Sequence, residues 1–175
     1  VEQLLDLSRL EAGMLRIEPE RVKLDELVSS SSASLQVITA EHDLVLDIPA
    51  DLPEVYVDGK RIMQVLNNLV TNAARYSPKG TCIEVRAVQE GSSIRVTVRD
   101  QGPGIPAEER EAVFEAFRQA TNRPGNEDKG AGLGLAIARG LIMAHGGRIW
   151  VEDTGEQGTT MAFTLPISHG QGEEG

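Results

Sequence analysis

The chain contains two glycine clusters, Asp100-Gln101-Gly102-Pro103-Gly104-Ile105 and Gly130-Ala131-Gly132-Leu133-Gly134-Leu135. Upstream of both lies an asparagine-bearing helical pattern, Gln64-Val65-Leu66-Asn67-Asn68-Leu69-Val70-Thr71-Asn72-Ala73-Ala74-Arg75-Tyr76. Each of these stretches is common when it occurs alone. In this order and at this spacing they predict a nucleotide pocket, with a carboxylate for the base, side-chain amides for a metal ion and two bare backbone segments for the phosphates.

The composition is that of one compact domain. The 175 residues are 40% apolar but only 3% aromatic, so we expect a core of Val, Leu, Ile and Ala. The net charge of −10 argues against nonspecific binding to nucleic acid, which needs a basic face. An acidic protein can still hold ATP where a few basic groups and a metal ion lie close together.

Cysteine use and hydropathy indicate a cytoplasmic protein. A single cysteine, Cys82, excludes an internal disulfide and a cysteine-rich metal site, which fits a reducing compartment. No apolar run approaches the roughly 20 residues of a membrane span, so we expect no membrane contact by this segment. The chain begins inside a helical pattern at Val1, so we expect a piece of a longer protein, whose membrane anchoring the sequence leaves open.

Periodicity predicts the order of the secondary-structure elements. Helical spacing or capping residues predict helices over 1–12, 25–40, 58–77, 106–114 and 132–145. Alternation predicts strands over 15–17, 42–48, 55–57, 81–89, 93–99, 148–152 and 159–165. These elements predict an α/β fold, a two-layer sandwich in which helices cover one face of an antiparallel or mixed sheet.

The helix before Pro78 has a polar face with chemical meaning. Asn68 and Asn72 are four residues apart and share that face, while Val65, Leu69 and Ala73 form a stripe that can face the core. Mg²⁺ prefers oxygen ligands and keeps several waters, so one amide oxygen plus phosphates is a sensible site. Arg75 could reach a phosphate. Without the glycine clusters, an ordinary exposed helix face would be the better interpretation.

The glycine clusters also have alternatives. A carboxylate at Asp100 can accept from the exocyclic amine of adenine, yet Asp-x-Gly is also a common turn. Bare N–H groups of Gly130, Gly132 and Gly134 at a helix N-terminus attract phosphate, whereas helix packing is a credible role for Gly134. The second cluster is neither a dinucleotide fingerprint nor a P-loop, because no strand precedes it and no Gly-Lys-Ser or Gly-Lys-Thr follows.

Five motifs stand together in a known order. They are Asn68…Asn72 with Tyr76, Asp100-x-Gly-x-Gly, Phe114…Phe117, Gly130-x-Gly-x-Gly and Gly158-Thr159. In this order of N, G1, F, G2 and G3 boxes, the chain resembles the catalytic, ATP-binding domain of bacterial sensor histidine kinases. That group belongs to an ATPase superfamily shared with gyrase, heat-shock chaperones and mismatch-repair proteins. The resemblance spans about residues 15–167 and implies the Bergerat fold, an α/β sandwich.

The resemblance implies a division of the chain and a role for each site residue. Residues 1–13 would end a dimerisation helix, 14–167 would form the ATP-binding catalytic domain, and 168–175 would be a disordered tail. Residues 118–131 would form a mobile ATP lid, anchored by Phe114 and Phe117. Asn72 would coordinate Mg²⁺, with Asn68 and Arg75 near the phosphates. The remaining contacts to ATP would come from Tyr76, Asp100, Gly102, Gly104, Ile105, Phe114, Phe117, Gly130, Gly132, Leu133, Gly134 and Thr159.

One departure from the family limits what this chain can do alone. The family's phosphoacceptor is a histidine followed by an acidic residue on the first dimerisation helix. His42 is followed by Asp43 but lies in a predicted strand, and glycines follow His145 and His169. The acceptor would therefore lie on a dimerisation domain outside this chain, in a homodimeric protein that signals to a response regulator. The resulting hypothesis is a domain that positions ATP–Mg²⁺ for transfer of the γ-phosphoryl group to histidine. An ATP-dependent interaction module of the same fold is the alternative, and a sigma-factor-regulating serine kinase stays open.

Overall fold

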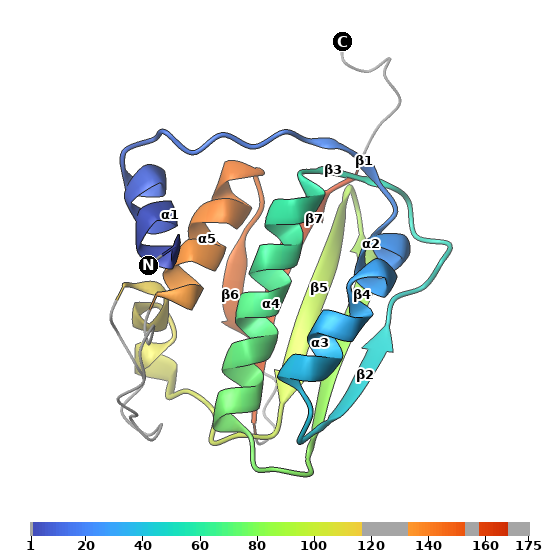
Figure 1. Cartoon of the computed structure of the whole chain (residues 1–175), viewed down its shortest axis with the longest axis vertical. Helices are drawn as coiled ribbons and strands as arrows, with labels where there is room; N and C mark the ends of the chain where they lie inside the picture. The colour runs from blue at the N-terminus through green and yellow to red at the C-terminus, as the bar shows by residue number, and fades with distance from the viewer. Residues whose placement is uncertain (1, 117–132, 153–157, 168–175) are drawn as a thin grey trace.

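The computed structural model describes residues 2–116, 133–152 and 158–167, with side chains from residue 4 onward. In these ranges the strands form a five-stranded sheet in the order β2-β4-β5-β7-β6 and a two-stranded sheet of β1 and β3. Figure 1 shows helices α3, α4 and α5 lying across one face of the larger sheet. The predicted two-layer α/β sandwich is confirmed.

The larger sheet is mixed because one pair of neighbouring strands is parallel. Strand β2 (Asp43–Asp47) pairs parallel with β4 (Cys82–Glu90), and all other neighbours are antiparallel. Strand β5 (Ser93–Asp100) forms a hairpin with β4, and β7 (Thr159–Pro166) lies between β5 and the edge strand β6 (Ile149–Glu152). This order places the last residue of β5, Asp100, beside the first residue of β7, Thr159.

The helical layer consists of long and short pieces. The described helices are α1 (Glu2–Glu11), α2 (Leu24–Ser30), α3 (Ser32–Ile38), α4 (Gly59–Tyr76) and α5 (Gly134–Ala144), with 3₁₀ turns η1 (Ala107–Glu109) and η2 (Ala112–Phe114). Helix α4 lies at the centre of the layer, and α1 packs beside α5 (Figure 1). The small sheet of β1 (Glu20–Val22) and β3 (Val55–Val57) caps one end.

The core lies between the helices and the sheet. The inward residues of β4 and β5 alternate with outward polar ones, as period-2 strands require. On α4 the stripe of Val65, Leu69 and Ala73 is buried against them, as predicted. At about 25 cal/mol per Å² of buried apolar surface, this amphipathic packing, rather than intrinsic helix propensity, is what holds α4 in place.

Local end signals correctly predicted several boundaries. Asp58 caps α4 by accepting the N–H of Arg61 at 3.4 Å through Oδ1. Gly13 has a φ of +71° and ends α1: its N–H donates to the carbonyl of Leu10 and the N–H of Met14 donates to that of Arg9. This is a Schellman motif, which explains why a glycine stands at the end of α1.

Three expectations about elements were wrong. The helix predicted over 25–40 is two helices, α2 and α3, broken at Ser31, and its N-cap is Lys23 rather than Asp25. Serine hydroxyls compete with the helical backbone for hydrogen bonds, so a run of four serines weakens the helix there. The strand predicted over 15–17 is absent, because the partner strand β3 pairs with residues 20–22 instead. The short helix predicted over 106–114 is two separate 3₁₀ turns.

Candidate nucleotide-binding site

Asp100 lies where strand β5 ends beside the start of its antiparallel neighbour β7. It is the last residue of β5 and stands opposite Thr159, the first residue of β7. Both side chains are only 3% exposed. One carboxylate oxygen of Asp100 accepts the N–H of Gly102 at 2.8 Å, which fixes the side chain at the start of the following turn. A carboxylate held in this way is preorganised to accept a hydrogen bond from a ligand.

The glycines around Asp100 are required by close backbone approach. A Cβ on Gly102 would lie 2.7 Å from the carbonyl oxygen of Tyr76, at the end of α4. Gly104 and Gly158 have φ values of +81° and +96°, and a Cβ on Gly158 would overlap the carbonyl oxygen of Asp100. A generic Asp-x-Gly turn does not require glycine for these reasons, so the glycines here leave backbone without side chains around the carboxylate. We call Asp100 together with Gly102, Gly104 and Gly158 the Asp100 corner.

The asparagine face of α4 meets the start of α5. Asn68 donates through Nδ2 to the carbonyl oxygen of Gly134 at 3.2 Å. A Cβ on Gly134 would sit 3.6 Å from Asn68 Cγ, an ordinary contact, so Gly134 is part of the α4–α5 packing. Asn72 is half-buried one turn further along α4, between Asn68 and Tyr76. The asparagine face of α4 therefore extends from the N-terminus of α5 to the Asp100 corner.

Several other predicted site residues are placed as parts of the surrounding wall. The side chains of Tyr76, Ile105, Phe114 and Leu133 are buried. Turn η2, which carries Phe114, packs against α5. Arg75 lies exposed on the last turn of α4. The predicted contacts Phe117, Gly130 and Gly132, the lid over 118–131 and the tail lie outside the described residues.

Neither described histidine is placed as a phosphoacceptor. The Nδ1–H of His145 donates to the carbonyl oxygen of Leu141 at 2.8 Å, and its Nε2 accepts the N–H of Asp58 at 3.1 Å. One neutral tautomer satisfies both bonds, so this buried imidazole joins the C-terminal end of α5 to the cap of α4. His42 lies with Nε2 3.2 Å from the carbonyl oxygen of Ser77. His169 lies outside the described residues.

The sequence did not predict the contacts of α1 with α4 and α5, which are polar on α4 and apolar on α5. The buried carboxylate of Asp6 accepts from Gln64 Nε2 at 2.9 Å and lies 3.6 Å from Arg61 Nη1, both on α4. On α5, a Cβ added to Gly140 would approach Leu10 Cδ1 to 2.8 Å. The signal that could have found this contact is a glycine in the middle of an apolar helix, which often marks close packing.

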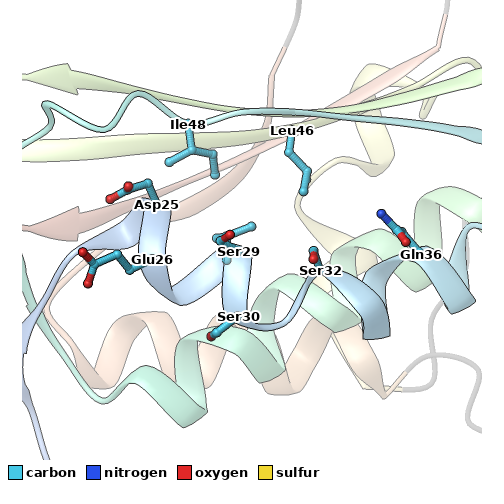
Figure 2. Close-up of a pocket in the computed structure, with 9 residues that line it drawn as sticks. Asp25, Glu26, Ser29, Ser30, Ser32, Gln36, Leu46 and Ile48 are labelled. Carbon is cyan, nitrogen blue, oxygen red and sulfur yellow. The ribbon is translucent and has the colours of Figure 1, made fainter.

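A separate groove lies between helices α2 and α3 and strand β2. Figure 2 shows Leu46 and Ile48 pointing from the strand side toward the two helices. The helix side contributes Asp25, Glu26, Ser29, Ser30, Ser32 and Gln36. None of the residues predicted to bind nucleotide lines this groove, so it is distinct from the corner around Asp100.

Comparisons with known proteins agree with the geometry. The family described as histidine kinase-, DNA gyrase B- and HSP90-like ATPase matches residues 57–169. The adaptive-response sensory kinase SasA of Synechococcus sp. (strain CC9311) is 37% identical over 179 residues, which covers 98% of this chain and 46% of that protein. The chain thus spans about half the length of the curated relatives it matches.

Solved structures show the same fold. Full-length ShkA, crystallised in complex with AMPPNP, has a TM-score of 0.80 and 28% identity, over 95% of this chain and 35% of ShkA. The nucleotide-free catalytic domain of the histidine kinase ThkA has a TM-score of 0.70 and 30% identity, over 87% of this chain and all (100%) of that domain. The chain belongs to the histidine kinase-, DNA gyrase B- and HSP90-like ATPase family. Within that family it has the fold of sensor histidine kinase catalytic domains, so the predicted resemblance is confirmed.

None of the helices in the described ranges combines the length and the apolar character needed to cross a bilayer.

Proposed function

We propose that this chain binds ATP with Mg²⁺ and acts as the catalytic half of a sensor histidine kinase. In this proposal the γ-phosphoryl group of ATP goes to a histidine on a dimerisation domain outside the chain. The observation that carries the proposal is the corner at Asp100, where a buried, preoriented carboxylate is surrounded by glycine backbone. A carboxylate in that setting accepts from the exocyclic amine of adenine and rejects guanine, which presents a carbonyl oxygen at that position.

The asparagine face of α4 supports a metal and phosphate role. The amide oxygen of Asn72 is a hard ligand of the kind that Mg²⁺ accepts, and the residue is half-buried between the Asp100 corner and the α5 N-terminus. Bound Mg²⁺ would neutralise charge on the phosphates during transfer. Asn68 holds the first residue of α5 through its amide, and Arg75 is a cation one turn from Asn72 with an exposed side chain.

The position of α1 supports a link to a dimerisation domain. Its last turns are seated on α4 and α5 through Asp6 and Leu10, so a helix entering from upstream would be held beside the asparagine face. We propose that residues 1–13 end a dimerisation helix and that 14–167 form the catalytic domain. A homodimeric whole protein with a response regulator as its downstream partner, acting in the cytoplasm, follows from this assignment.

The test is phosphotransfer with separated parts. The chain alone, incubated with γ-labelled ATP and Mg²⁺, should accumulate no acid-labile phosphate, because the proposed acceptor histidine lies outside the chain. Of the described histidines, His145 uses both ring nitrogens in structural hydrogen bonds and His42 uses Nε2. Adding the dimerisation helices of the same protein should produce acid-labile phosphohistidine on those helices. ATP binding without any phosphohistidine in that mixture would contradict the kinase proposal and favour an ATP-dependent interaction module.

A further inference from the structure

Ser77 attaches the turn that follows Asp100 to the C-terminal end of α4. It is the C-cap of α4, and its N–H donates to the carbonyl oxygen of Ala73 at 3.0 Å. Its hydroxyl oxygen accepts the N–H of Gln101 at 3.3 Å. Gln101 is the residue between Asp100 and Gly102, so this bond reaches the middle of the turn.

The surroundings make the attachment a tight one. Ser77 is buried, with an exposed fraction of 7%. Its backbone is extended, with φ of −91° and ψ of 144°, as expected for the residue before a proline, which turns it out of the helix. Beside it, Gly102 approaches the carbonyl oxygen of Tyr76 so closely that no side chain could be inserted. The turn and the helix end are therefore in direct contact, with the hydroxyl of Ser77 bridging them.

A third segment meets the same residue. The carbonyl oxygen of Ser77 lies 3.2 Å from Nε2 of His42, immediately before β2. Asp43 is then paired through its N–H with the carbonyl oxygen of Thr81 at 3.0 Å. Ser77 thus joins α4, the Asp100 turn and the start of β2, and its own position is fixed from two sides.

We infer that Ser77 is a positioning residue for recognition of the nucleotide base. Its hydroxyl fixes the position of the turn after Asp100 relative to α4. The carboxylate of Asp100 and the amide of Asn72 are then placed to contact the same bound nucleotide. Ser77 acts through the backbone of Gln101 and does not itself contact the ligand. The inference rests on the proposed binding of ATP and adds a determinant of base selectivity to it.

The first arm of the test measures the bond directly. Ser77→Ala removes the acceptor, so the amide of Gln101 should exchange with solvent faster in NMR hydrogen exchange, while the amide of Val96 in β5 stays protected. Ser77→Thr keeps the hydroxyl and should restore protection of Gln101. This arm does not depend on ATP binding, so it separates a failure of the inference from a failure of the proposed function.

The second arm measures selectivity by calorimetry. A hydrogen bond of this kind is worth about two- to twelvefold in an equilibrium constant. Ser77→Ala should weaken ATP binding by a factor in that range and reduce the preference for ATP over GTP, and Ser77→Thr should recover both. If the wild-type chain bound no ATP, the proposed function would fail and with it the selectivity role of Ser77.

The matched control is Thr39→Val. Thr39 is also a buried C-cap hydroxyl, which donates to the carbonyl oxygen of Leu35 at 2.9 Å at the end of α3. This substitution should lower the urea midpoint while ATP affinity and base preference stay at wild-type values. Two results would overturn the inference: unchanged Gln101 exchange in Ser77→Ala, or equal losses of ATP and GTP affinity that follow only the loss of stability.

Discussion

The packing of Leu10 against Gly140 makes a quantitative prediction about α1. Alanine in place of a mid-helix glycine normally stabilises a helix by about 1 kcal/mol, because glycine loses more backbone entropy on folding. Here the new Cβ would approach Leu10 Cδ1 to 2.8 Å and Cδ2 to 3.2 Å, so the leucine has to move. Displacing a half-buried leucine costs about 1 kcal/mol, half the value for full burial. We therefore expect Gly140→Ala to leave the free energy of unfolding nearly unchanged in the intact chain.

The same substitution should behave differently once Leu10 is truncated. A Leu10→Ala background removes the three atoms nearest the new Cβ, which are Cδ1, Cδ2 and Cγ of Leu10, and Gly140→Ala should then stabilise the chain by about 1 kcal/mol. Urea unfolding of the wild type, Gly140→Ala, Leu10→Ala and the double substitution gives the coupling energy between the two positions, which we expect to be about 1 kcal/mol. Leu5→Ala is the control, since Leu5 is on the same helix but 51% exposed, and its coupling with Gly140→Ala should be near zero. A full stabilisation by Gly140→Ala in both backgrounds would refute the seating of α1 on α5.

Three further substitutions test the proposed metal ligand and the hydrogen bonds of the two described histidines. Asn72→Ala should lower Mg²⁺-dependent ATP binding more than binding of ADP without metal in calorimetry, because the amide oxygen is the proposed metal ligand; equal losses would make the residue structural. His145→Leu should lower the free energy of unfolding by about 1–3 kcal/mol, since the N–H of Asp58 loses its acceptor in a partly buried setting. His42→Leu should cost less, because only one ring nitrogen of His42 has a partner among the described residues, and thermal unfolding that ranked the two the other way would contradict this.

Local signals in the sequence predicted the elements whose ends are determined locally. Asp58 and Gly13 act on the neighbouring turn of backbone, so the cap of α4 and the stop of α1 could be read directly. The pairing of β3 with residues 20–22 rather than 15–17 could not, because partner choice depends on chain segments that are far apart in sequence. The break at Ser31 is also a competition, between hydroxyl hydrogen bonds and helix continuation, that periodicity does not register.

In the candidate site, too, local sequence indicated some features, and others depend on contacts between distant segments. The residue types at Asp100 and Asn72 indicated their proposed chemistry only in combination with the glycine clusters, because Asp-x-Gly alone is also a common turn. The reason for each glycine was not readable, since Gly102 approaches Tyr76 and Gly158 approaches Asp100 only in the folded chain. The bridging role of Ser77 likewise depends on a contact across 24 positions of sequence.

The most direct test of the account is calorimetry of ATP and GTP, each with Mg²⁺, against the wild-type chain and Asp100→Asn. The wild-type chain should bind ATP and prefer it to GTP. In Asp100→Asn an amide donor can face the adenine amine, which also donates, and a buried mismatch of this kind costs about 1–3 kcal/mol, or roughly tenfold to a hundredfold in affinity. Binding of ATP that is unchanged in Asp100→Asn, or a wild-type chain that binds both nucleotides equally, would contradict the assignment of the corner at Asp100 as the adenine site.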